Sequence, residues 1–111
     1  MGLRMSDTST TAGVEVTDNP GESRYEARLE GNLAGIAQYI RTDELIAFVH
    51  TEVERAYEGR GVGSALVRAS LDAARADGVA VLAVCPFYTG WIGRHREYQD
   101  LLYTSGSRVT D

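Results

Sequence analysis

The stretch Glu58-Gly59-Arg60-Gly61-Val62-Gly63-Ser64 lies between an apolar, strand-like run, Leu45 to Val53, and an amphipathic, helix-like run, Val62 to Ala76. Its three glycines stand at alternate positions, so few side chains cover the backbone N–H groups of the turn. At a helix N-terminus such groups have no partners within the helix, and the helix dipole favours an anion there. The sequence therefore predicts a phosphate-binding turn over residues 58–64.

The run that follows the turn has the spacing of a helix that buries one side. Apolar residues recur at helical intervals, at Val62, Leu66, Ala69 and Ala73, and Gly78 suits the left-handed position at a helix C-terminus. The next six residues, 79–84, are all apolar, which is typical of a strand buried on both faces. A strand that follows a helix in this way is expected to run parallel to the strand before it. Residues 45–84 thus predict one β-α-β unit.

The residues before the turn alternate in the manner of antiparallel strands separated by turns. The expected strands are a short one around Gly13 to Val16, then Glu22 to Leu29, Leu33 to Arg41 and Leu45 to Val53, the last of them central in the sheet. After the parallel strand, Phe87 to Arg94 and Arg96 to Tyr103 predict short helices that pack on the sheet. The fold class is α/β, with a mixed sheet made of an antiparallel meander and one β-α-β unit. The domain spans residues 13–103, with a disordered leader over 1–12 and a flexible tail over 104–111.

Size and composition narrow the class of protein. A chain of 111 residues is expected to form one domain. The net charge is −5 and all 11 basic residues are Arg, which argues against a broad nucleic-acid surface. No run is long and apolar enough for a membrane span, and the N-terminus lacks the apolar segment of a secretory signal. With 1 Cys no intrachain disulfide can form, which fits a cytoplasmic protein, and no spacing of Cys and His indicates a metal site.

Two familiar phosphate motifs are excluded at the glycine-rich turn. The Lys-Ser/Thr ending of the Walker loop is missing. A dinucleotide fingerprint would have the spacing Gly-x-Gly-x-x-Gly after the first strand of a parallel fold, whereas here the spacing is Gly-x-Gly-x-Gly after a meander. A lone glycine cluster is more often a flexible connection than a binding site. Its position between a meander and a parallel strand favours a binding site here.

This order of elements resembles the GNAT superfamily of acetyl-CoA-dependent N-acyltransferases. The family's phosphate motif, Arg/Gln-x-x-Gly-x-Gly/Ala, is matched by residues 58–63 except at Glu58, where a carboxylate replaces the usual Arg or Gln. Further similarity, in Phe48-Val49-His50-Thr51-Glu52-Val53, Cys85-Pro86-Phe87 and the run from Arg94 to Leu102, is to the minimal YjdJ-type branch. In that branch a Pro usually follows the residue that is His95 here. The resemblance covers roughly residues 14–103, nearly all of the expected domain.

The resemblance implies acetyl-CoA as cosubstrate and an amine as acceptor. Residues Glu58, Gly59, Arg60, Gly61, Val62, Gly63 and Ser64 are expected to hold its pyrophosphate. Thr51 and Val53, at the end of the strand, would hold the thioester and the pantetheine arm through backbone groups. Tyr88, three residues after Cys85, is the best-placed candidate for protonating the leaving thiolate, a role that a Tyr has in many larger GNAT enzymes.

Cys85 and His50 are the candidate catalytic residues. Cys85 follows the parallel strand, at the end where open α/β sheets place their ligands, and a thiolate there could accept the acetyl group. A free Cys is also often a small buried apolar residue, and both roles remain open. His50 is expected to share a strand face with Ile46 and Phe48 and to act as general base or to activate Cys85. The alternative for His50 is a structural residue with a backbone partner.

Two classes of function fit these residues. The first is an N-acetyltransferase that moves an acetyl group from acetyl-CoA to an unidentified amine, on a small molecule or a protein. The alternative is a module that binds CoA or acetyl-CoA without turnover. In either case we expect a monomer or weak homodimer that binds neither nucleic acid nor a membrane, and no metal. A small interaction domain unrelated to CoA is the third option.

Overall fold

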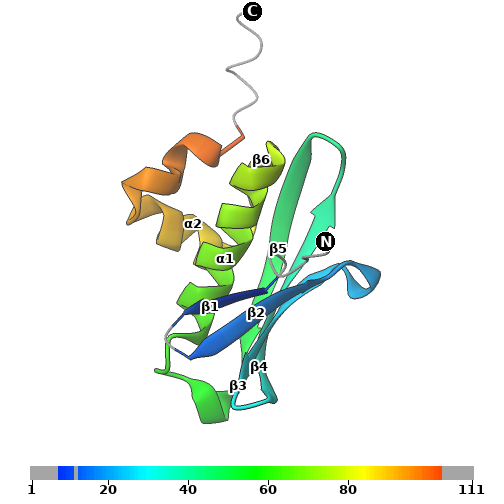
Figure 1. Cartoon of the computed structure of the whole chain (residues 1–111). Helices are drawn as coiled ribbons and strands as arrows, with labels where there is room; N and C mark the ends of the chain where they lie inside the picture. Colours follow the sequence, from blue (N-terminus) through cyan, green and yellow to red (C-terminus); the bar gives the residue numbers. More distant parts are fainter. Residues whose placement is uncertain (1–7, 12, 104–111) are drawn as a thin grey trace, which may run out of the picture.

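The computed structural model describes residues 8–11 and 13–103. In these ranges the chain forms a six-stranded sheet whose strands lie side by side in chain order (Figure 1). The strands are β1 (Thr8–Thr11), β2 (Val14–Asn19), β3 (Arg24–Leu29), β4 (Asn32–Arg41), β5 (Leu45–Val53) and β6 (Ala80–Ala83). The first five pair antiparallel, and β6 pairs parallel to β5. The predicted α/β architecture is confirmed.

The helix after the glycine-rich turn is α1 (Val62–Asp77), which begins at the predicted residue and ends one residue later than expected. Its C-terminus is closed by Gly78, whose φ of 71° is the left-handed conformation that glycine adopts without strain. The side of α1 that carries Val62 and Leu66 is buried, as the helical spacing predicts. No helix in the described ranges is both long and apolar enough to cross a bilayer.

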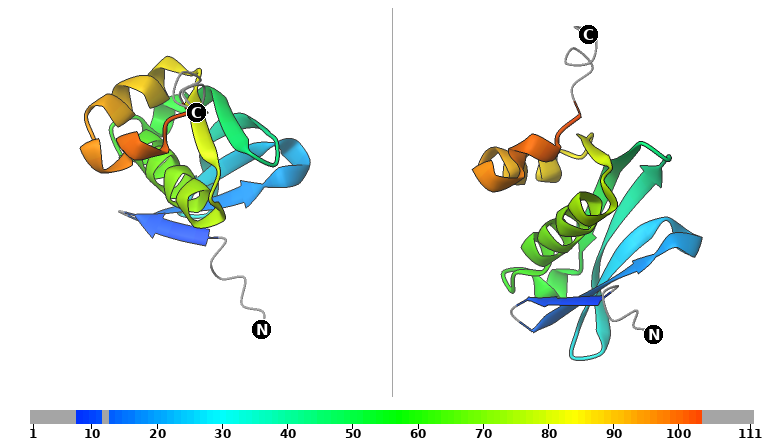
Figure 2. Two further views of the ribbon diagram at one scale, coloured as in Figure 1. Left: turned by 90° about the horizontal axis from the view of Figure 1, so that it is seen from above. Right: turned by 45° about the horizontal axis from the view of Figure 1, so that its top comes forward.

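The core lies between the sheet and a single layer of helices (Figure 2). At Gly35 in β4, an added Cβ would lie 2.9 Å from Val62 Cγ1, so β4 and the start of α1 are in close contact. The short helix α2 (Pro86–Gly93) continues this layer, because the Tyr88 ring stacks on Phe48 of β5 with centroids 4.3 Å apart. The last element is the 3-10 helix η4 (Arg96–Leu101), where we expected a helix.

Strand β6 differs from the prediction of a strand buried on both faces. Val81 is buried, but the side chain of Leu82 is 38% exposed and that of Val84, just after the strand, is 55% exposed. The reason is position: β6 is the edge strand of the sheet, with only an isolated bridge from Val81 to Leu102 on its outer side. The apolar residues of β6 therefore line one buried face and one partly open face. The prediction that both faces of this strand are buried is wrong.

The N-terminal prediction also needs correction. Thr8–Thr11 form β1, which pairs with β2, so the prediction of disorder is wrong for these four residues. Threonine is a β-branched residue and suits a strand, a preference that the polar composition obscured. The following strand, β2, extends to Asn19, three residues beyond the expected end. The rest of the expected leader, residues 1–7 and 12, and the expected tail, 104–111, lie outside the described residues.

Candidate functional site

The glycine-rich turn gives α1 an N-terminus that no side chain caps. The 3-10 helix η3 (Arg55–Tyr57) connects β5 to the turn. Gly59 and Gly61 have φ of +82° and +83°, a conformation that other residues rarely adopt, and Gly61 is the N-cap. No side-chain hydrogen bond caps the helix, whose first backbone N–H groups thus face the turn. The start of α1 thus leaves backbone donors without a side-chain cap at the position where the anion site is predicted.

The third glycine of the turn, Gly63, serves packing. A Cβ at this position would lie 2.8 Å from Cζ of Phe87, the second residue of α2. One residue later, the Ser64 hydroxyl accepts a hydrogen bond from Trp91 Nε1 at 3.2 Å. These contacts fix the turn against α2, although the sequence associated Gly63 with the anion alone. Phe87 itself is 41% exposed beside the turn.

Strands β5 and β6 pair along only half of β5. Their register runs from Leu45 with Ala80 to Phe48 with Ala83. The N–H groups of Val84 and Cys85 then both donate to the Phe48 carbonyl, at 3.1 and 2.9 Å. Because β5 continues to Val53 while the pairing ends at Phe48, the two strands separate there. Thr51 and Val53, the residues expected to hold the pantetheine arm, lie in the part of β5 beyond this point.

Cys85 lies where the two strands separate and is the N-cap residue of α2. Its thiol is 3.4 Å from the Thr51 hydroxyl, and the residue is only 6% exposed. Burial raises the pKa of the Cys85 thiol, but the Thr51 hydroxyl and the backbone N–H groups at the start of α2 stabilise the thiolate. Together they outweigh the effect of burial, and the pKa is lowered from its usual value. The structure thus brings Cys85 and Thr51 together.

His50 lies on the opposite face of β5 from the one predicted. In the pairing with β4, Gln38 is opposite His50 but Tyr39 is opposite Phe48, so Val49 is an extra residue in β5. Such a bulge reverses the alternation of side chains, and Thr51, instead of His50, joins Phe48 on the face that α1 covers. The His50 side chain is 51% exposed, and its Nε2 is 2.8 Å from the Glu52 carboxylate. The prediction that His50 shares a face with Phe48 and activates Cys85 is wrong.

Tyr88 is placed in the core. Its side chain is fully buried, and its hydroxyl is 2.7 Å from the hydroxyl of Ser70, a buried residue of α1. Burial raises the pKa of Tyr88 far above its usual value, so the phenol stays protonated and is held by Ser70. Its backbone N–H donates to the Cys85 thiol, but its hydroxyl is held by Ser70 and solvent does not reach it. The phenol thus lies in the core, and its role in protonating a thiolate or binding a cofactor stays a prediction.

The exposed residues of the turn are open to a ligand. Glu58, Arg60 and Gly61 are exposed, and Glu58 lies just after η3 with its backbone N–H bonded to the Arg55 carbonyl. Glu58 is thus the first residue of the stretch that is predicted to bind an anion. Across residues 8–11 and 13–103, no three His, Cys, Asp or Glu side chains gather as metal ligands would.

Comparison with known proteins gives a family and a fold. The sequence profile of a family described as GCN5-related N-acetyl-transferase matches residues 24–101. A search of curated proteins gives no significant match. Among solved structures, a GCN5-like protein from Staphylococcus aureus is 24% identical with a TM-score of 0.62, and the match covers 84% of this chain and 91% of that one.

Two further structures resemble this chain over part of their length. Ard1 from Thermoplasma volcanium is 23% identical with a TM-score of 0.50, and the match covers 57% of this chain and 44% of that chain. A ribosomal-protein-alanine N-acetyltransferase from Brucella melitensis biovar Abortus 2308 is 18% identical with a TM-score of 0.51, over 83% of this chain and 62% of that one. This chain therefore spans less than two thirds of either protein. At these identities the likeness shows the fold alone.

Proposed function

Because the chain belongs to the GCN5-related N-acetyltransferase family, we propose that it binds acetyl-CoA and transfers the acetyl group to an amine. The observation that carries this proposal is the combination of two features on one strand-helix unit. The N-terminus of α1 is uncapped at a turn held open by two left-handed glycines, and β5 separates from β6 four residues into its length. The first feature suits a pyrophosphate, and the second leaves strand backbone free for an extended ligand arm.

In this proposal the glycine-rich turn and strand β5 bind different parts of acetyl-CoA. The backbone N–H groups of the first turn of α1 bind the pyrophosphate, and residues 49–53 of β5 bind the pantetheine arm along the strand edge. The acetyl group then lies near Thr51 and Cys85, where the strands separate. Glu58 opposes the pyrophosphate, and Arg60 in the same turn offsets its charge. A cytoplasmic location and a monomeric or weakly dimeric state stay predictions.

Two chemical routes fit the position of Cys85. In the covalent route, the Cys85 thiolate attacks the carbonyl carbon of the thioester, a new C–S bond forms, and CoA leaves as a thiolate that takes up a proton. The amine then attacks the acetylated Cys85, a C–N bond forms, and the C–S bond breaks to regenerate the Cys85 thiolate. The proton lost by the amine passes to a base and then to solvent. In the direct route, the amine attacks acetyl-CoA itself. The lowered pKa of the Cys85 thiol supports the covalent route.

His50 is proposed as the base for the amine and not as a partner of Cys85. It lies on the face of β5 opposite Thr51, with its Nε2 beside the Glu52 carboxylate, a contact that orients the ring. An amine that approaches from that face would meet His50 before it meets the thioester. His50 and Cys85 would thus act from opposite faces of β5.

The experiment that tests the proposal is intact-mass measurement after incubation with acetyl-CoA, followed by transfer to a panel of amines. We expect the wild-type protein to gain the mass of one acetyl group and Cys85→Ser to gain none. The rate of transfer to the amine should also depend on Cys85. If Cys85→Ser transfers the acetyl group at the wild-type rate, the protein is an acetyltransferase but the covalent route is wrong. Binding of acetyl-CoA without transfer to any amine would favour the binding module over the enzyme.

A further inference from the structure

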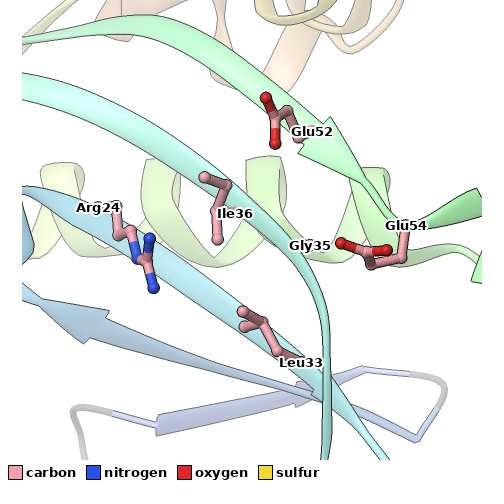
Figure 3. A pocket seen from close by; sticks show the side chains of 6 residues that line it. All are labelled: Arg24, Leu33, Gly35, Ile36, Glu52 and Glu54. Carbon is pink, nitrogen blue, oxygen red and sulfur yellow. The ribbon is translucent and has the colours of Figure 1, made fainter.

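The face of the sheet opposite α1 carries a hollow that the proposed function has not yet used. In the described part of the chain, α1 and α2 both pack on the other face, where Tyr88 contacts both Phe48 and Ser70. Figure 3 shows the hollow with α1 behind the sheet and the lining side chains in front of it. It is lined by Arg24, Leu33, Gly35, Ile36, Glu52 and Glu54 and has a volume of about 150 Å³.

The lining is divided between an apolar floor and a negatively charged side. Leu33 and Ile36 of β4 form the floor, and the Leu33 side chain is 37% exposed. Glu52 and Glu54 come from the end of β5 and the residue after it. The two carboxylates lie along the side of the hollow that β5 forms, as Figure 3 shows. The hollow therefore offers a hydrocarbon surface and two carboxylates within one small volume.

The charge of the hollow is not balanced. Its one basic side chain, Arg24, donates from Nε to the Glu26 carboxylate at 2.9 Å, so this cation already has a partner outside the hollow. Within residues 8–11 and 13–103, the one ion pair of Glu52 is with His50, and Glu54 has no ion pair. A cation that entered the hollow would thus meet negative charge without displacing an existing ion pair of Glu54.

We propose that this hollow binds the acceptor as an alkylammonium group, with its hydrocarbon stem on Leu33 and Ile36 and its nitrogen between Glu52 and Glu54. A small hollow of this kind suits a short aliphatic amine, such as butylamine or the end of a lysine side chain. The carboxylates attract the cation, and the floor selects an aliphatic stem over a bare ammonium ion. The proposal rests on the proposed acetyl transfer, since it identifies the chemical class of the acceptor.

The hollow shares strand β5 with the two candidate catalytic residues' contacts, Glu52 beside His50 and Thr51 beside Cys85. Glu52 contacts His50, the proposed base, through the 2.8 Å contact. Thr51, between them in the chain, points to the other face and contacts Cys85. The hollow and the thiol thus lie on opposite faces of the same three residues of β5, just beyond the point where β6 separates. An amine released from Glu52 to His50 would approach the acetyl group from the side that Cys85 does not occupy.

The first test measures amine binding by NMR in the absence of acetyl-CoA. Titration of ¹⁵N-labelled full-length protein with n-butylamine hydrochloride is expected to shift the amide signals of Leu33, Ile36, Glu52 and Glu54 in a saturable way. Butan-1-ol, which lacks the charge, and ammonium chloride, which lacks the stem, are expected to shift them at least several-fold less at equal concentration. Equal effects of all three compounds, or shifts spread over the whole surface, would overturn the proposal.

The matched variants are Glu54→Lys and Glu44→Lys. Both reverse one exposed carboxylate, but Glu44 lies at the other end of β5, outside the hollow. We expect Glu54→Lys to weaken butylamine binding roughly fivefold to tenfold, because an attraction becomes a repulsion in a partly exposed site. Glu44→Lys is expected to bind as wild type does. Equal loss in both variants would indicate a general effect of net charge and would contradict the site.

Acetyl transfer then distinguishes the source of the amine. With acetyl-CoA present, the rates for n-butylamine and for Nα-acetyl-lysine methylamide separate a free amine from a lysine side chain. In Glu54→Lys we expect a higher KM for the preferred amine with kcat nearly unchanged, since Glu54 binds the acceptor without taking part in the reaction. A fall in kcat at constant KM would contradict this role.

The failures of the two proposals can be told apart. If acetyl-CoA binds and is used but butylamine does not enter the hollow, the acceptor site is wrong and the proposed function stands. If butylamine binds at the hollow but calorimetry detects no acetyl-CoA binding, the proposed function is wrong and the hollow is an amine site of another kind.

Discussion

At the scale of single residues, the contacts of Cys85 bear directly on the reactivity of its thiol. The Thr51 hydroxyl lies 3.4 Å from the sulfur, and the N–H groups that begin α2 point toward it. Both favour the thiolate and counteract burial, which favours the thiol. Thr51 is therefore the residue whose change reports most directly on the reactivity of Cys85.

We predict that Thr51→Val raises the pKa of the Cys85 thiol, because it removes a donor to the thiolate without changing the size of the side chain much. The pH at which alkylation by iodoacetamide reaches half its maximal rate should move upward in Thr51→Val. Thr51→Ser keeps the hydroxyl and should retain the wild-type midpoint. If Thr51→Val alkylates with the wild-type pH profile, the hydroxyl does not control the thiol.

Sequence reasoning located Cys85 correctly at the end of the last strand, since a Pro immediately after an apolar run marks a strand end. It failed for His50, because the side-chain alternation of β5 is interrupted at Val49 and the residue types there give no sign of a bulge. For Tyr88, the three-residue spacing from Cys85 indicated proximity, but only the packing shows that the ring lies on Phe48.

At the scale of elements, the contact of β4 with α1 fixes where the binding turn lies. A Cβ at Gly35 would lie 2.8 Å from the Glu52 carbonyl oxygen and 2.9 Å from Val62 Cγ1. The first obstacle is backbone of β5, which cannot move aside as the tip of a side chain can. Gly35 thus lets the first turn of α1 approach the sheet at the strand that leads into the turn.

Gly35→Ala is expected to lower the free energy of unfolding by about 2 kcal/mol, the usual cost of forcing a methyl group into a packed site. The matched control is Gly93→Ala at the end of α2, where an added Cβ meets no heavy atom within 4 Å. That variant should change stability by less than about 1 kcal/mol, in the stabilising direction. Urea denaturation measures both, and equal effects would contradict the close packing of β4 on α1.

Strand β3 carries a charged cluster that predicts acid sensitivity. Glu26 accepts hydrogen bonds from Asn19, Arg28 and Arg24, which lower its pKa from 4.5 to about 2. Because the pKa is lower in the folded state, the unfolded chain binds a proton first as the pH falls. The cluster therefore stabilises the fold fully above pH 4.5, and this stability is lost as the pH falls toward 2.

The shift corresponds to at most ~3 kcal/mol, and the solvent exposure of the arginines reduces this to about 1 to 2 kcal/mol. Between pH 5 and 2 we expect wild type to lose about 1 to 2 kcal/mol more stability than Glu26→Gln does, as measured by urea denaturation at fixed salt. Glu26→Gln should be less stable than wild type at pH 7 and nearly equal to it at pH 2. A parallel fall of both proteins with pH would show that Glu26 does not carry the effect.

The elements themselves were predictable to differing degrees. The ends of β5 and the start of α1 follow from the turn residues on both sides, and the prediction matches within one residue. The edge position of β6 was not predictable, because an apolar run of four to six residues fits an interior strand equally well. Likewise, β1 is short and polar, and its composition predicts no strand. Pairing with β2 stabilises it.

At the scale of the molecule, the helices of the described residues lie on one face of the sheet (Figure 2), and the hollow proposed for the acceptor lies on the other. The family profile spans residues 24–101, which include β5, the turn, α1 and Cys85. The covered face would then hold acetyl-CoA between the turn and the separated strands, and the open face would hold the amine. Glu58, where the family usually has Arg or Gln, is the feature of this chain that opposes cofactor binding.

The measurement that tests this account most directly is a calorimetric titration of the full chain with acetyl-CoA. The account predicts saturable binding at one site, with a dissociation constant below millimolar, and no detectable binding by Gly61→Glu, because a side chain and a negative charge would fill the anion site at the start of α1. Circular dichroism confirms that the variant is folded, and Arg60→Glu, which imposes no backbone strain, should weaken binding as well. The absence of binding by wild type at millimolar acetyl-CoA, or equal binding by wild type and both variants, would contradict the account.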